Sequence, residues 1–121
     1  MAVLHDDVLD DGLQALTDAT SKVLHITSAQ PSSFGNVAAV TLGNKTPPTV
    51  GAPEARAGSG RKVVVSAITD GAVTGTGTAS HWALVDGARL LASNTLSASQ
   101  AVTSGNVFTL AAFDIGIPGP A

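Results

Sequence analysis

Apolar residues at helical spacing open the chain. Five of them recur with a period of about 3.6 residues and would lie on one stripe of a helix: Leu4, Val8, Leu9, Leu13 and Leu16. Aspartates crowd the same turns, where the helix dipole and unpaired backbone N–H groups favour negative charge; they are Asp6, Asp7, Asp10 and Asp11. The pattern predicts a helix within residues 1–21 that ends near Ala19–Ser21.

From Lys22 onwards, short segments alternate apolar and polar residues, and turn-forming residues separate them. These segments predict β-strands at Lys22–Ser28, Val37–Gly43, Arg61–Thr69, Ala72–Ala79, Ser80–Val85, Arg89–Ser93 and Val107–Ile117. Turns are expected where Gly accepts a positive φ at little cost, at Asp70-Gly71, Asp86-Gly87 and Ser104–Asn106. A loop is expected at Ala29–Asn36, and Gln100–Thr103 would lead into the last strand.

Strands that return about every 8–12 residues with turns between them are typical of a sandwich or a small barrel. We therefore expect residues 1–121 to form a single domain of mainly β structure. Its fold class would be an antiparallel β-sandwich or a small, jelly-roll-like barrel with one short N-terminal α-helix. The proline-rich segment Asn44–Gly60 would be an extended loop or arm that contacts a neighbouring subunit instead of its own domain.

Charged residues make up only 12% of the chain, about half of the usual share for a soluble domain. Because free monomers normally carry more surface charge, this composition favours a protein whose surface is covered in an assembly. The net charge of −3 argues against a nucleic-acid partner, which would require clustered Lys and Arg. No apolar run approaches the ~20 residues that span a membrane, so no membrane association is expected. The absence of Cys excludes disulfides and zinc–cysteine sites.

Side chains that could carry chemistry are few and scattered. The histidines, His5, His25 and His81, show no metal-ligand spacing, and the N-terminal aspartates have no loop that would converge them on Ca²⁺. The run Gly71–Gly77 lacks the lysine and the following helix of a phosphate loop, and no nucleophile elbow occurs. No catalytic, cofactor-binding or metal-binding residue is therefore predicted, and the chain is not expected to be an enzyme or to hold a cofactor.

Trp82 supports two interpretations. In an apolar strand a lone Trp is usually buried in the core, here with Leu84 on the same strand face and Phe108 or Phe113 across the sandwich. An exposed Trp82 could instead stack on a sugar ring, as in a carbohydrate-binding adhesin module. The exposure of the Trp82 ring separates the two interpretations.

Two regions of the sequence carry a series of short motifs. The C-terminal region holds an aromatic-flanked strand, a short Leu-rich strand, a Val-x-x-Gly-x-x-Phe strand and an apolar close; these are His81–Asp86, Arg89–Ala92, Val102 with Gly105 and Phe108, and Phe113–Ile115. The N-terminal region contributes Asp7–Leu16, Leu24–Ser28 and Leu42–Thr46. Together these motifs cover most of the chain, and they resemble those of a group of small virion proteins of tailed bacteriophages.

The resemblance implies a β-sandwich that occupies many equivalent positions on the phage particle. The first function it implies is that of a capsid decoration or cement protein that stabilises the head. The alternative is a tail component, in the tail tube, the tail tip or a fibre. The partners would be the major capsid protein or other virion proteins, together with further copies of the chain in a homo-oligomer. Such a protein is made in the bacterial host cytoplasm and resides in the virion.

Overall fold

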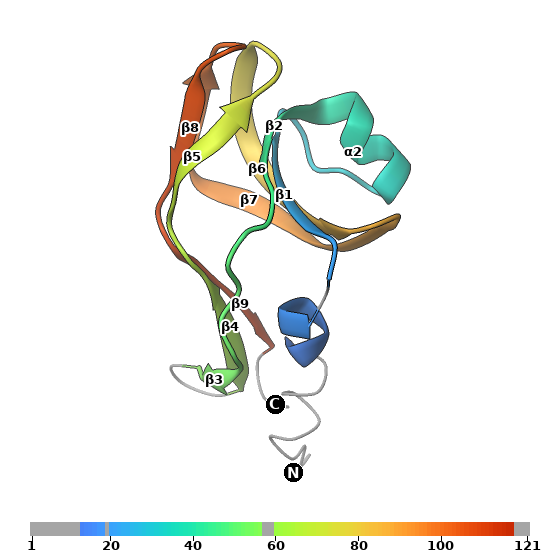
Figure 1. Ribbon diagram of the computed structural model, residues 1–121, viewed down its shortest axis with the longest axis vertical. Helices are drawn as coiled ribbons and strands as arrows, with labels where there is room; N and C mark the ends of the chain where they lie inside the picture. The colour runs from blue at the N-terminus through green and yellow to red at the C-terminus, as the bar shows by residue number, and fades with distance from the viewer. Residues whose placement is uncertain (1–12, 19, 57–59, 118–121) are drawn as a thin grey trace. The chain divides into compact units, whose positions relative to one another are not determined.

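The computed structural model describes residues 13–18, 20–56 and 60–117 (Figure 1). Residues 13–18 are helical. The labelled elements follow in the order β1 (Lys22–Thr27), α2 (Phe34–Val40), β2 (Thr41–Lys45), β3 (Glu54–Ala55), β4 (Arg61–Val65), β5 (Ile68–Val73), β6 (Gly77–Asp86), β7 (Arg89–Val102), β8 (Val107–Leu110) and β9 (Phe113–Ile117). The part of the predicted helix before residue 13 lies outside the described residues, as does Ala19.

The strands form two antiparallel sheets, one in each of two compact units. One unit, with residues 20–48 and 68–110, contains α2 and a six-stranded sheet in the order β7-β6-β1-β2-β5-β8. Figure 1 shows that this sheet curls like half of a barrel. The other unit contains helical residues 13–18 and a three-stranded sheet in the order β3-β4-β9. The predicted fold class is confirmed, whereas the single domain over residues 1–121 stays a prediction.

β6 carries much of the core of the six-stranded unit. Its residues Trp82, Ala83, Leu84 and Val85 are all buried, so the strand is covered on both faces. Ala83 and Val85 pack with Val37 of α2, which places the helix on one face of the sheet. Trp82 is 6% exposed, and its predicted burial is confirmed.

α2 occupies a part of the chain where the sequence pattern predicts a loop and a strand. Ser33 caps the helix: its backbone is extended, and its Oγ accepts a hydrogen bond from the N–H of Asn36. The predicted loop is confirmed at residues 29–33 but is wrong at residues 34–36, and the predicted strand is confirmed at residues 41–43 but is wrong at residues 37–40. Adjacent alanines favour a helix there once a cap starts it. The strand in this region, β2, begins only at Thr41.

The proline-rich segment packs on its own unit. Val50 is buried and bridges to Val65 of β4, and the Gly51 N–H donates to a carbonyl group of β4 at 2.9 Å. β3 then pairs with β4. The expectation that Asn44–Gly60 does not pack on its own domain is therefore wrong for residues 49–55, and also for Asn44 and Lys45, which pair within the six-stranded sheet as part of β2. β4 presents a strand edge whose backbone groups need partners, and this segment supplies them.

Two segments predicted as continuous strands are each divided between the sheets. Arg61–Thr69 supplies β4 and the start of β5, with Ser66 and Ala67 outside both. Val107–Ile117 supplies β8 and β9, with two alanines between them. Alanine is depleted in strands because it offers little side chain to pack on a pleated surface. Small residues therefore interrupt both strands.

The turn predicted at Asp70-Gly71 is wrong, because both residues lie inside β5. β5 pairs there with β2 on one side and with β8 on the other, and a bulge lies in its ladder with β8 between Ile68 and Gly71. The other two predicted turns are confirmed. They contain Gly87 at φ +57° and Gly105 at φ +91°, both in the left-handed region that favours glycine.

Candidate interaction surface

β7 forms one edge of the six-stranded sheet, and β6 is the only described strand that pairs with it. At 14 residues it is the longest described strand. The sequence pattern predicts only its first part, the strand Arg89–Ser93, because the residues that follow show no regular apolar spacing. Gln100–Thr103 is expected only to lead into the last strand. One signal for a continuous strand is present, since no Gly or Pro occurs between Gly87 and Gly105.

The outer part of β7 is exposed and uncharged. Its exposed residues include Asn94, Thr95 and residues 97–99. After Arg89 the sequence contains no Asp, Glu, Lys or Arg before Asp114, so β7 beyond its first residue and the opposite edge strand β8 carry no charge. Edge strands of monomeric proteins are commonly guarded by charged side chains, Lys above all. Neither edge strand of this sheet has such charged side chains, apart from Arg89 at the start of β7.

Two irregularities shape the edge. Leu91 has no direct partner on β6, and residues 96–99 lie opposite the single residue Ser80. Extra residues of this kind bend a strand and interrupt the row of backbone groups that a further strand could pair with. The edge therefore offers two short regular stretches, residues 92–95 and 100–102, in place of one long one.

Amide side chains bind backbone and hydroxyl groups along this edge. The Asn94 Oδ1 accepts from the N–H of Thr95 at 2.8 Å, and the Gln100 Nε2 donates to the Thr109 carbonyl of β8 at 2.7 Å. The Gln30 amide donates to the Ser93 hydroxyl. These neutral hydrogen bonds can be exchanged for bonds to a partner with little loss, because each amide both donates and accepts. The surface suits contacts by uncharged polar groups.

Asp86 fixes the start of β7. Its carboxylate accepts from the Ser21 N–H at 2.9 Å and forms an ion pair with Arg89 across the β6–β7 turn. The Arg89 hydrogen bond and the Ser21 N–H hold the pKa of Asp86 below its ordinary value. The carboxylate therefore stays ionised at neutral pH and ties the turn to the residue before β1.

The two described histidines each bind a neighbouring hydroxyl. The His25 Nδ1 lies 2.8 Å from the Thr41 Oγ1, and the His81 Nδ1 lies 2.7 Å from the Ser80 Oγ. Within residues 13–18, 20–56 and 60–117, no group of three or more His, Cys, Asp or Glu could hold a metal ion. His5 and the N-terminal aspartates, Asp6, Asp7, Asp10 and Asp11, lie outside the described residues.

His25 should make the stability of the protein depend on pH. Burial lowers the pKa of His25 below 6.5. Between the folded pKa and 6.5, the unfolded chain therefore binds a proton at His25 and the folded chain does not. The free energy of unfolding should therefore fall as the pH drops below about 6.5 and level off below the folded pKa. Urea unfolding of the parent and of His25→Gln, which keeps a polar group beside Thr41, would measure this. Equal pH dependence in both would contradict the prediction.

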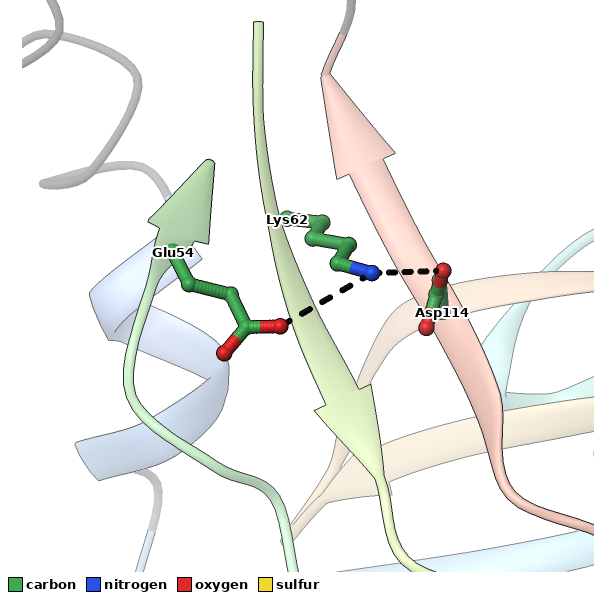
Figure 2. Close-up of polar contacts among 3 residues, drawn as sticks. All are labelled: Glu54, Lys62 and Asp114. Carbon is green, nitrogen blue, oxygen red and sulfur yellow. Dashed lines mark hydrogen bonds and ion pairs between the residues drawn. The ribbon is translucent and has the colours of Figure 1, made fainter. Parts of the chain in front are cut away.

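Lys62 lies between two carboxylates on the three-stranded sheet (Figure 2). Its Nζ is 3.7 Å from Glu54 Oε1 on β3 and 3.2 Å from Asp114 Oδ2 on β9. Figure 2 shows the three side chains converging across β3, β4 and β9. Both carboxylates are more than half exposed, and pairs of this kind contribute about 0–1 kcal/mol. The cluster links side chains of three adjacent strands.

The chain matches no protein-family model, no curated protein and no solved structure. None of the described helices is long and apolar enough to cross a membrane.

Proposed function

We propose that this chain is a structural protein of a tailed-bacteriophage particle, and that it acts as a decoration or cement protein on the capsid. The observation that carries the proposal is the long edge strand β7, which has no charge after Arg89 and is exposed at residues 94–95 and 97–99. An edge of this kind is a liability for a free monomer and a suitable surface for a protein that is covered in an assembly. The sequence resemblance to small phage virion proteins supports the same class.

The proposed partners are the major capsid protein and further copies of this chain. Few charges lie on the surface, so the contacts would consist of backbone hydrogen bonds and of Ser, Thr, Asn and Gln side chains. A protein that binds the assembled shell and not the separate subunits stabilises the shell by mass action.

The burial of Trp82 argues against the carbohydrate-binding adhesin. A ring that is 6% exposed has no free face on which a sugar could stack. The adhesin interpretation depended on this residue, and the sequence contains no other Trp and no Tyr.

Particles without this protein should assemble but release their DNA more readily under stress. A cement protein bridges subunits already in place, so its loss weakens the shell and does not prevent its construction. DNA release from purified particles, with and without the protein, would be followed on heating and on chelation. Adding back the purified protein is the control and should restore resistance. Particles that resist heat equally but lack tails, or fail to adsorb to cells, would overturn the decoration proposal in favour of a tail component.

A further inference from the structure

The hydrogen bonds of β6 show which backbone groups of β7 are turned outward. The Gly87 N–H, just after β6, donates to the Ser21 carbonyl just before β1, so Gly87 faces β1. Backbone groups alternate between the two sides of an antiparallel strand, and β6 pairs with β1 without a register shift. His81 and Ala83 therefore also face β1, and the residues between and beyond them face β7.

Ser93 and Thr95 of β7 lie opposite Ala83 and His81. Because those two residues of β6 face β1, Ser93 and Thr95 form non-hydrogen-bonded pairs with β6, and their N–H and C=O groups point to the outer side of β7. A further contact agrees with this orientation: the Thr95 N–H donates to the Oδ1 of its neighbour Asn94 at 2.8 Å. The edge therefore presents a backbone donor and acceptor on either side of Asn94.

We propose that a second copy of the chain pairs with this edge, β7 against β7, about a two-fold axis through Asn94. Ser93 of each copy then faces Thr95 of the other, and each of these two pairs exchanges two backbone hydrogen bonds. The Thr95 N–H leaves the Asn94 side chain for the Ser93 carbonyl of the second copy. Ser and Thr side chains that face each other across strands add stability. The two Asn94 amides meet at the axis, where each can both donate and accept.

Charge and occupancy favour this partner over the opposite edge of another copy. After Arg89, β7 contains no charged residue, so pairing of the strand with itself at Asn94 brings no like charges together. The opposite edge strand β8 has four residues, and its Thr109 carbonyl already accepts from Gln100 of the same chain at 2.7 Å. A pairing of β7 with β8 would compete with this bond. The inference rests on the proposed function only for the edge that both use, and it names the partner there.

Sedimentation equilibrium of the full-length protein over a range of concentrations would test the pairing. We expect the parent to form a dimer and Asn94→Lys to remain a monomer, because the axis would bring two lysines together. Thr95→Pro should also remain a monomer, since it removes an N–H that the pairing uses and that does not bond to β6. Thr109→Lys is the matched control: it adds the same charge to an exposed position of β8 and should leave the dimer intact. Circular dichroism would show that the variants are folded.

The outcomes separate the pairing from the proposed function. A parent that stays monomeric at every concentration would overturn the pairing, whereas the decoration proposal is judged by DNA release from particles. Longer oligomers that Thr109→Lys abolishes would replace the pairing by a head-to-tail contact of β7 with β8. A dimer that survives both Asn94→Lys and Thr95→Pro would also overturn it. Loss of the dimer in these two variants alone would confirm the pairing, even if particles without the protein resisted heat equally and so contradicted decoration.

Discussion

Replacement of Trp82 by alanine is expected to lower the free energy of unfolding by about 3–5 kcal/mol, the range for deletion of a large buried aromatic side chain. Trp82 is 6% exposed and faces Ile26 of β1, and both Ile26 and the neighbouring Leu84 are fully buried. Few other large residues can fill the space, since the sequence has three Phe and no Tyr. For a domain of ordinary stability, about 5–15 kcal/mol, this loss is large.

Urea unfolding followed by far-ultraviolet circular dichroism would measure the loss, because the variant has no Trp fluorescence left. Phe34→Ala is the matched control: this aromatic residue starts α2 and is 40% exposed, so its removal should cost much less. Equal stability of Trp82→Ala and the parent would contradict the burial of the ring in solution. If that variant also lost binding to a glycan, the adhesin interpretation would replace the structural one.

The sequence predicts the fold class well because the relevant signal is local and repeated. Period-two alternation identifies β1, and a short continuous apolar run identifies the buried part of β6. The turn at Gly87 follows from a residue that accepts positive φ. The same logic fails at Val37–Val40, where the apolar and alanine residues fit either period. There the Ser33 side chain caps the first turn and so favours the helix.

The strand ends and the sheet partners could not be predicted from single segments. Whether a strand stops at Val65 or runs to Thr69 depends on its neighbours in the two sheets, and these lie far away in the sequence. The same holds for the candidate surface. The edge position of β7 follows from strand order, which no residue of β7 encodes by itself. Only the absence of Gly and Pro within it was available as a signal.

Gly71 shows why a strong local turn signal can be overruled. The ring of Phe108 lies across it: a Cβ atom at position 71 would be 2.2 Å from Phe108 Cε1 and 2.3 Å from its Cζ. The two residues face each other in the β5–β8 ladder. An aromatic ring that covers a glycine on a neighbouring strand replaces the side chain that the glycine lacks. The glycine is therefore required for space and not for a turn.

Gly71→Ala should therefore destabilise the protein by about 1–3 kcal/mol, as overpacking of a core does. Phe108 is 2% exposed, so its ring cannot move aside without displacing the core around it. Phe108→Leu should relieve the clash, and the double variant should be more stable than the sum of the single changes predicts, by about 0.5–3 kcal/mol.

Gly35→Ala is the control for Gly71→Ala, since the chemical change is identical. Gly35 lies in α2, and a Cβ there would meet no atom within 4 Å. Alanine favours a helix over glycine by about 1 kcal/mol, so this variant should be more stable than the parent. Urea unfolding of the four variants gives all the values. The Phe108 packing would be refuted if both glycine substitutions changed stability in the same direction, or if Gly71→Ala and Phe108→Leu were simply additive.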